Sequence, residues 1–336
     1  MKTSAGEALG PQDWDRALLR QPAPSLLQSW RWGELQARFG WRVDRIAFDG
    51  GGSGVCSLQR ADGLWPRSTI AYVPRGPAIA PSAAAEVLAE LEARARRARD
   101  MVLRIEPQVP AGDPMTQALT RRRFQPGEPV QPHATRLLDL TPEPEALRAA
   151  FKSKTRYNLS LAERKGVVVR ATRDVDTFAR LAEATARRQG IALPAAPYYR
   201  AALDIFEPDD GVRLYLASHD GRTLAGIMVF RFGDTAYYLF GGSTDEGREV
   251  MPNYLLHWTA MLDYRALGCR VYDWWGIPEE PAPDHPWFGL YRFKTGFGGT
   301  TVRYAGLYER VLRPGRWGWD RRLRKLKQRV RGPILR

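Results

Sequence analysis

The spacing of apolar residues along the chain predicts a mixture of helices and strands. Apolar and aromatic residues recur at helical spacing over 25–38. Apolar and polar residues then alternate in three successive runs, as half-buried strands do, at 42–48, 54–59 and 69–73. A helical pattern over 82–99, apolar on one face and arginine-rich on the other, leads into a strand over 101–106. The first half is therefore predicted to contain strand, strand, strand, helix and strand in that order.

The second half repeats this order. After a strand at 167–171 and helices near 174–189 and 197–205, three strands joined by hairpins are expected at 213–218, 223–232 and 236–240. A long helix follows, with Pro252 in its first turn and Gly268 just after its end, the positions that these residues favour. A strand at 270–274 completes the repeat. We therefore predict two similar α+β halves, each a mixed sheet flanked by helices.

Length and proline content place the boundary between the halves. The chain has 336 residues, which corresponds to two domains at about 150 residues each. The proline-rich segment 141–145 is expected to be the boundary. After Leu312 the chain is strongly basic and is predicted to form a helix that folds back on one of the halves.

Composition indicates an ordinary folded protein with a basic surface. With 44% hydrophobic and 26% charged residues, the chain is neither collagen-like, coiled-coil nor wholly disordered. Lys and Arg number 51 against 37 Asp and Glu, which gives a net charge of +14. A positive field of this size attracts polyanions, so nucleic acid, nucleotide phosphates and anionic lipid are the candidate partners.

The cysteines and the apolar runs favour a cytoplasmic location. Cys56 and Cys269 are the two cysteines and lie far apart, so we expect neither a disulfide framework nor a cysteine-based metal site. The first residues lack the apolar run of a signal peptide, and no stretch approaches the roughly 18 apolar residues of a membrane span. Peripheral contact with the inner face of the membrane remains open.

Several common active-site patterns are missing. The four histidines lack the spacing that a metal site needs, so no metal is expected; they are His133, His219, His257 and His285. The segment 241–245 lacks the closing glycine of a nucleophile elbow, and 296–299 lacks the glycine pattern of a dinucleotide fold.

Coenzyme A is a plausible donor for two halves of this kind. However, segment 245–251 before the long helix contains one glycine and three carboxylates, a poor cradle for a pyrophosphate. An N-acyltransferase that uses coenzyme A or another carrier on a small amine stays an alternative. A non-catalytic protein that binds RNA or membrane is a third.

Three motifs in a fixed order carry a family resemblance. They are Tyr-Val-Pro-Arg-Gly-Pro at 72–77, Phe-Lys-Ser-Lys-Thr-Arg-Tyr-Asn at 151–158 and Gly-Leu-Tyr-Arg-Phe-Lys-Thr-Gly-Phe-Gly-Gly at 289–299. Weaker matches are Gln28-Ser29, Trp32-Gly33, Gly40-Trp41, Tyr272-Asp273 and Gly276. Together they resemble the Fem family of peptidoglycan-bridge aminoacyltransferases, especially its compact FemX-like members.

The resemblance implies both a fold and a reaction. It implies two tandem acetyltransferase-like (GNAT-like) domains: 1–145 with 313–336, closed by the C-terminal helix, and 146–312. It also implies that no coenzyme A or other cofactor is used. An aminoacyl group would move from aminoacyl-tRNA to the side-chain amine of the third stem-peptide residue of UDP-MurNAc-pentapeptide or lipid II. Phosphates on both substrates would explain the basic charge.

The chemistry is assigned to the motif around Lys294. A fixed ammonium can stabilise the negative charge that develops on an ester carbonyl during aminolysis, and the family also points to this lysine. Without the resemblance, Lys294 would be taken for a solvated residue at a helix end. Phe293 is either core or a wall for the terminal adenosine. Asp273 could polarise the incoming amine or cap a loop at the end of its strand.

Substrate contacts are expected from several charged and aromatic groups. Lys152, Lys154 and Arg156, followed by Tyr157 and Asn158, combine cations with a stacking ring, although a solvated helix face would look the same. Arg75, held before Gly76-Pro77, is a candidate for a diphosphate or carboxylate, with structural pairing as the alternative.

The remaining candidates lie near the front of the chain and on two later helices. Trp32 belongs to a family motif, and Gln36 stands where the family often has a lysine that holds the nucleotide diphosphate. Arg38 could compensate, or the acceptor could be lipid-linked. Tyr254 and Arg200 are expected to face a cleft from two different helices.

Overall fold

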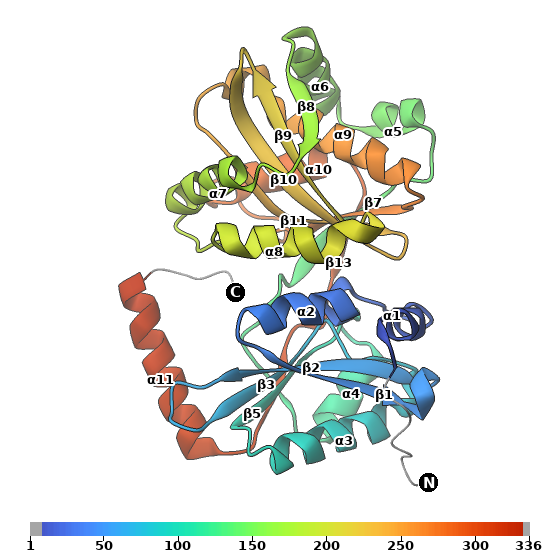
Figure 1. Cartoon of the computed structure of the whole chain (residues 1–336), viewed down its shortest axis with the longest axis vertical. Coiled ribbons are helices and arrows are strands. Elements are labelled where there is room, and N and C mark those ends of the chain that lie inside the picture. Colours follow the sequence, from blue (N-terminus) through green and yellow to red (C-terminus); the bar gives the residue numbers. More distant parts are fainter. Residues whose placement is uncertain (1–8, 332–336) are drawn as a thin grey trace. The chain divides into compact units, whose positions relative to one another are not determined.

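The computed structural model describes residues 9–331, with side chains described up to Leu326, and the chain forms two compact units (Figure 1). Within the described range, the first unit contains residues 9–133 and 303–331, and the second contains residues 134–302. Each unit is a mixed sheet flanked by helices, so the predicted α+β fold is confirmed.

The first unit is built on a sheet with the strand order β1-β2-β3-β5-β14-β6, and β4 pairs with β2. Its strands are β1 (Arg42–Phe48), β2 (Gly54–Asp62), β3 (Thr69–Pro74), β4 (Ala78–Ile79), β5 (Val102–Glu106), β6 (Gln125–Pro126) and β14 (Tyr308–Val311). Its helices are α1 (Pro11–Leu19), α2 (Trp30–Arg38), α3 (Ala84–Arg97), α4 (Pro114–Arg121) and α11 (Pro314–Arg331), with 3-10 turns η1 (Leu26–Gln28), η2 (Asp49–Gly51) and η3 (Pro81–Ala83). Helices α1 and α2 lie on one face of the sheet, and α3 and α4 lie on the other (Figure 1).

Helix α3 connects two parallel strands of this sheet. Strands β3 and β5 are neighbours and run parallel. The pairs β1–β2, β2–β3, β2–β4, β5–β14 and β6–β14 are antiparallel. A parallel connection needs a crossover, and α3 supplies it. Its apolar face, with Val87, Leu88 and Leu91, packs against strand residues such as Leu58 and Leu103. The arginines of α3 therefore remain on its outer side, as the periodicity predicted.

The second unit has the strand order β13-β7-β12-β11-β10-β9-β8. Its strands are β7 (Ala134–Asp139), β8 (Val168–Thr172), β9 (Val212–His219), β10 (Arg222–Phe232), β11 (Thr235–Ser243), β12 (Val271–Gly276) and β13 (Thr300–Arg303). Its helices are α5 (Pro144–Ala150), α6 (Ser153–Arg164), α7 (Val175–Gln189), α8 (Ala196–Phe206), α9 (Pro252–Ala266) and α10 (Phe288–Gly296), with 3-10 turns η4 (Glu207–Asp209) and η5 (Arg248–Val250).

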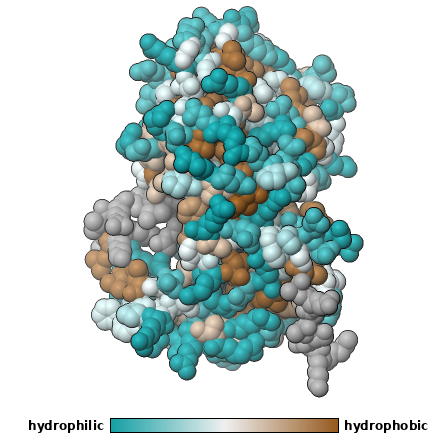
Figure 2. Space-filling model, in the orientation of Figure 1, coloured by the Kyte–Doolittle hydropathy of each residue, from teal (hydrophilic) through white to brown (hydrophobic). Residues whose placement is uncertain are grey.

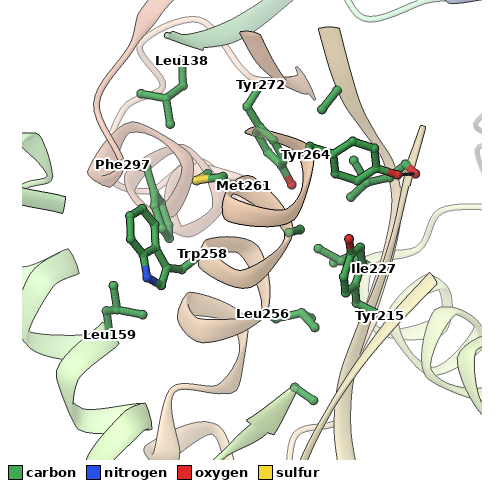
Figure 3. Close-up of a cluster of buried hydrophobic side chains, with 14 of the residues drawn as sticks. Leu138, Leu159, Tyr215, Ile227, Leu256, Trp258, Met261, Tyr264, Tyr272 and Phe297 are labelled. Carbon is green, nitrogen blue, oxygen red and sulfur yellow. Dashed lines mark hydrogen bonds between the residues drawn. The ribbon is translucent and has the colours of Figure 1, made fainter. Parts of the chain in front are cut away.

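Helix α9 plays the same part here that α3 plays in the first unit. It joins β11 to β12, which are parallel neighbours. Figure 3 shows Trp258 and Phe297 together on one side of α9, and Tyr215 and Ile227 on the side of the strands. The predicted repeat of three strands, a helix and a strand is thus present in both units.

The units divide earlier in the chain than the sequence predicted. The proline-rich segment begins α5, while β7 before it already pairs with β12, with Asp139 opposite Val271. The chain also returns to the first unit at residue 303, not 313, because β14 pairs with β5. Both boundaries follow from which strands pair with each other. The proline-rich segment gave no information about that pairing, so it misplaced the boundary.

Local signals placed the ends of the predicted long helix correctly, whereas the first predicted helix differs from the structure, and α1, α4, α5 and α10 were not predicted. Pro252 stands in the first turn of α9, and Gly268 after its last residue has the left-handed backbone expected there, with φ +85°. The helix predicted over 25–38 is interrupted, because Ser29 is extended and its hydroxyl accepts a hydrogen bond from Trp32 N–H. Ser29 therefore caps α2 and ends the preceding 3-10 turn.

The helix after Leu312 is α11, and it belongs to the first unit. Trp317 is buried against Ile70, Met101 and Val102, and the Asp320 carboxylate accepts a hydrogen bond from Leu64 N–H at 2.5 Å. Within residues 9–331, no helix is both long and apolar enough to cross a membrane. The face of the molecule in Figure 2 is dominated by hydrophilic side chains.

Candidate active site

Lys294 lies at the end of α10, in the interior of the second unit. Its side chain is buried, with 4% of the residue exposed. The ammonium donates hydrogen bonds to two backbone carbonyls of β12, Trp274 at 2.8 Å and Gly276 at 2.7 Å. Two partners use two of its three N–H groups, so one donor remains for another acceptor.

A kink in β12 brings both carbonyls to one nitrogen. In a regular strand, carbonyls two residues apart are separated by about 6.7 Å, which two hydrogen bonds from one nitrogen cannot span. Trp275 has a left-handed backbone with φ +55°, and the pairing of β12 with β7 shifts register between Asp273 and Gly276. The kink shortens this end of the strand, so the Trp274 and Gly276 carbonyls both reach the Lys294 ammonium.

Asp273 holds this kink in place. It is buried, and its Oδ1 accepts hydrogen bonds from Trp275 N–H at 2.7 Å and from the hydroxyl of Thr135 on β7. The same hydroxyl lies 3.1 Å from the Trp275 carbonyl. The carboxylate therefore bridges the strand before and after the kink.

Burial changes the acidity of Lys294. Loss of hydration disfavours the ammonium and lowers the pKa of Lys294 from 10.5 to about 7, and the nearby Asp273 charge opposes part of this shift. Both protonation states are therefore populated near neutral pH. A group of this kind is suited to acid, base or electrostatic catalysis.

Aromatic rings surround the lysine. Phe293 is half-buried and packs against Tyr254, with ring centroids 5.0 Å apart, and against Phe297 at 5.4 Å. The Lys294 nitrogen is 5.3 Å from the centre of the Tyr238 ring. Gly241 gives Tyr238 its space, since a Cβ there would lie 2.2 Å from the Tyr238 hydroxyl. Phe293, Tyr254 and Lys294 thus form one cluster.

His257 belongs to the same cluster, although its sequence context gave no reason to select it. It is buried on α9, and its Nδ1 lies 2.9 Å from the Tyr272 hydroxyl. Burial and the Lys294 charge hold the pKa of His257 well below its usual value, so the ring is neutral. Its spacing of three residues from Tyr254 on one helix face is the only local signal that could have indicated it.

Two sequence motifs meet beside this cluster. The backbone N–H of Lys152 donates to the Gly296 carbonyl at 2.9 Å, which joins the start of α6 to the end of α10. A Cβ at Gly296 would lie 2.3 Å from the Thr155 hydroxyl, and one at Gly299, where φ is +81°, would lie 2.3 Å from the Leu137 carbonyl. These glycines allow close approach of the backbone.

The predicted cationic cluster on α6 divides into two groups. Lys152, Lys154 and Tyr157 are exposed, Tyr157 by 60%. Arg156 is also exposed, but it donates to the carbonyls of Ala149 and Phe151 at the end of α5. Asn158 is buried with Thr155, Leu159 and Ala162, which face the core. Arg156 therefore has a structural partner, and Asn158 is separated from the solvent-facing group.

Arg200 lies apart from the Lys294 cluster. It is exposed on α8 and forms an ion pair at 2.9 Å with Asp176 of α7. Tyr254, with which the sequence grouped it, contacts Phe293 and Phe297 instead. The contacts of Arg200 and those of Tyr254 therefore have no residue in common.

The first unit contains the other predicted contacts. Trp32 is buried on α2, Gln36 is half-buried and Arg38 is exposed in the last turn. The family motif Gln28-Ser29 has a structural explanation. The Gln28 side chain donates to the Pro74 carbonyl at 2.7 Å and accepts from Ser57 N–H at 2.8 Å, which ties η1 to β2 and β3.

Arg75 is buried in the first unit at the end of β3. Its Nη2 donates to the Pro132 carbonyl at 2.5 Å, and its guanidinium lies 4.1 Å from the centre of the Tyr304 ring. The Gly76–Pro77 bond that follows is cis. These contacts support a structural role for Arg75, which connects the end of β3 to Pro132 and Tyr304.

The described part of the chain contains no metal cluster, and a pocket in its first unit has charges that are largely paired. Residues 9–331 contain no group of His, Cys, Asp and Glu suited to a metal. A pocket of about 600 Å³ in the first unit is lined by Arg42, Arg60 and Arg67 among others. Asp62 pairs with Arg42, and Asp44 and Asp100 pair with Arg60, so much of its charge is neutralised.

The chain is similar to known transferases over almost its whole length. Residues 148–294 match the family of acetyltransferase (GNAT) domains. A lipid II:glycine glycyltransferase of Staphylococcus aureus is 23% identical, and the similarity covers 90% of this chain and 91% of the relative. These matches fit an acyl-transfer enzyme. The resemblance to the Fem family that its motifs indicated is confirmed.

Solved structures agree on the fold. The crystal structure of FemX has a TM-score of 0.84 at 21% identity and covers 95% of this chain and 99% of its own. A tandem GNAT protein from the clavulanic acid biosynthesis pathway has a TM-score of 0.53 at 18% identity, covering 89% and 94%. Both support two tandem GNAT-like halves.

Proposed function

We propose that this enzyme transfers an aminoacyl group from aminoacyl-tRNA to the side-chain amine of the third stem-peptide residue of a peptidoglycan precursor. The observation that carries the proposal is the buried Lys294 ammonium, seated on the Trp274 and Gly276 carbonyls inside the Fem-type motif. Full-length similarity to a lipid II:glycine glycyltransferase supports this class of acceptor.

The chemistry is the aminolysis of an ester. The acceptor nitrogen attacks the carbonyl carbon of the aminoacyl ester, and a new C–N bond forms. The bond between that carbon and the ribose oxygen then breaks, and the proton lost by the amine passes to the ribose oxygen. No covalent intermediate with the enzyme is required, so orientation of the substrates supplies part of the acceleration.

Lys294 stabilises the oxyanion in this scheme. Two of its N–H groups are fixed by backbone carbonyls, and the third is available to the developing charge on the ester oxygen. A donor that is already oriented and dehydrated interacts strongly with such a charge. Phe293 and Tyr254 form an aromatic wall beside it, suited to packing against the terminal adenosine of the donor.

Asp273 is a positioning residue rather than the base. Its carboxylate is occupied by Trp275 N–H and the Thr135 hydroxyl, which orient the carbonyls under Lys294. Its negative charge also favours the charged form of the lysine. Lys152, Lys154 and Tyr157 are exposed on α6 and suited to contact the phosphates and bases of the tRNA.

A lipid-linked acceptor fits the first unit better than a soluble one. Gln36 provides no positive charge where related enzymes often have lysine, and Arg38 lies exposed in the last turn of the same helix. Lipid II is also the acceptor named for the Staphylococcus aureus relative. We therefore favour lipid II over UDP-MurNAc-pentapeptide, and an enzyme that works beside the inner membrane surface.

Mass spectrometry tests the proposal. The purified enzyme is incubated with a mixture of aminoacylated tRNAs and either lipid II or UDP-MurNAc-pentapeptide. A mass increment of one amino acid on an acceptor is expected, and it identifies the donor residue. The K294M variant is the matched control, and unacylated tRNA is the negative control. Absence of an increment on both acceptors would overturn the proposal.

A coenzyme A-dependent N-acyltransferase is the second candidate, because the matched domain family is the GNAT acetyltransferases. The loop before α9 argues against it. Pro252 begins the helix without an N–H group, and the Tyr254 N–H already donates to the Met251 carbonyl at 3.1 Å. The loop also contains the carboxylates of Asp245, Glu246 and Glu249. Calorimetry with acetyl-coenzyme A would revive this candidate if binding were micromolar.

A further inference from the structure

Helix α11 exposes large apolar side chains on the face turned away from its unit. Trp319 is 55% exposed and Leu326 is 59% exposed. The opposite face of the helix holds the buried Trp317 and Asp320. Residues seven apart lie on the same side of a helix, so Trp319 and Leu326 form one outward apolar stripe. In Figure 2 a hydrophobic patch lies over this helix.

Cations flank this stripe. Arg316, Arg322 and Lys325 are exposed, and within the part of the chain with described side chains none of them pairs with a carboxylate. Arg324, by contrast, is held by Asp320 at 2.5 Å, on the docked side. The sequence continues with further basic residues at 327, 329 and 331. The outward face of α11 is therefore apolar along its middle and positive at its sides.

A neighbouring loop contacts α11 on its docked side. Leu64 N–H donates to Asp320 at 2.5 Å, so the loop of residues 63–68 lies against α11. In this loop Trp65 is 38% exposed, and Arg67 is exposed and lines the pocket of about 600 Å³. Two neighbouring elements of the first unit thus each expose a tryptophan and an arginine.

We infer that the outward face of α11 binds anionic membrane lipid. An amphipathic helix with lysine and arginine beside tryptophan and leucine lies in the interface between headgroups and acyl chains. The cations match anionic headgroups, and the apolar stripe enters the acyl boundary. RNA would satisfy the cations but would leave Leu326 in water, so lipid fits the whole surface better. The inference does not depend on the proposed transfer reaction, because plain vesicles contain no acceptor.

Vesicle co-sedimentation of the full chain tests the inference. Phosphatidylcholine vesicles are compared with vesicles that contain about one-third phosphatidylglycerol, and binding is expected only to the second kind. The variant W319S/L326S should bind at least about tenfold more weakly. The control L19S/V168S removes two exposed apolar residues elsewhere and should bind as the wild type does.

A second matched pair of variants tests the contribution of the positive charges to vesicle binding. R316Q/R322Q should weaken binding by about tenfold or more, since each cation near an anionic surface contributes about fivefold. R180Q/R187Q removes the same charge from α7 and should have a smaller effect. Circular dichroism melting verifies that all variants remain folded.

Three results would overturn the inference. One is equal binding to neutral and anionic vesicles. Another is unchanged vesicle binding by W319S/L326S. The third is loss of tRNA binding by that variant while vesicle binding persists, which would assign the surface to RNA. Transfer to lipid II dissolved in detergent and to UDP-MurNAc-pentapeptide, both measured without vesicles, shows separately whether the proposed reaction itself fails.

Discussion

The carboxylate of Asp273 accepts a hydrogen bond from the backbone N–H of Trp275, two residues further along β12, at 2.7 Å. This short connection spans the point where Trp275 adopts its left-handed backbone. It fixes the spacing of the Trp274 and Gly276 carbonyls, which both accept from Lys294. Asp273 therefore acts on the site through the backbone.

The D273N variant separates positioning from base catalysis. The asparagine oxygen can still accept from Trp275 N–H, so the kink should persist and substantial activity should remain at pH 6. Loss of the negative charge should lower the pKa of Lys294 further, because Asp273 raises it in the wild type. The pH at which the rate stops rising should therefore be lower than in the wild type. Steady-state rates over pH 5–9 measure this shift.

D273A completes this test. Alanine removes the acceptor for Trp275 N–H, so this variant should lose far more activity than D273N. If D273N were inactive at every pH while melting like the wild type, Asp273 would be the base and its positioning role would be wrong.

Replacing Lys294 by methionine should abolish most of the transfer. Loss of one oriented oxyanion donor typically lowers kcat by about 10²–10³-fold. The apolar side chain has a similar length, and KM should change little. Lys165→Met, at an exposed lysine after α6, is the matched control and should keep full activity. Turnover of K294M within a few-fold of the wild type would contradict the assignment.

The pH dependence of kcat should report the protonation of Lys294. The ammonium is the active form, and its fraction falls as pH rises through the pKa of about 7. The acceptor amine must also lose a proton, and a side-chain amine has a pKa of about 10. The rate should therefore rise up to about pH 7 and then level off, because the gain in free amine is cancelled by the loss of the Lys294 ammonium. In K294R the side chain stays charged over the accessible range, so the rate should keep rising above pH 7. A wild-type rate that also keeps rising above pH 7 would contradict the role of the Lys294 ammonium.

The exposed lysines at the start of α6 should affect tRNA binding rather than chemistry. K152Q/K154Q should raise KM for aminoacyl-tRNA, leave kcat unchanged and reduce the salt slope of binding by about 2, one for each phosphate contact. Filter binding at several salt concentrations measures the slope. R156Q is the contrasting variant. Because Arg156 bonds the carbonyls of Ala149 and Phe151, R156Q should mainly lower the melting temperature.

Gly299 should be intolerant of a side chain. Its φ of +81° would strain an alanine by about 1–3 kcal/mol, and the added Cβ would also meet the Leu137 carbonyl at 2.3 Å. Gly166 has a similar φ of +75° with open space around it, so G166A contains the strain without the contact. Urea unfolding should show a larger loss for G299A than for G166A. Equal losses would mean that the backbone relaxes around Leu137.

The sequence by itself determined the repeated order of elements and the motif that contains Lys294. Periodicity and caps act over a few residues, so the pattern of β1, β2, β3, α3 and β5 and its counterpart could be predicted directly. The family motif likewise selected Phe293 and Lys294 without any knowledge of their surroundings. These features are local, and local sequence specifies them.

Tertiary structure decided what surrounds Lys294 and which cations have other partners. The β12 kink, the neutral His257 beside Tyr272 and the carbonyls that hold Arg156 all join residues distant in the chain or depend on backbone conformation. In sequence, Arg156 and Lys154 look alike, yet one bonds the end of α5 and the other is exposed. The same holds for β7, whose place in the second unit depends on pairing with β12, more than a hundred residues later. Such hydrogen bonds and strand pairs form only when the folded chain brings separate segments together. The order of residues does not show which segments will meet.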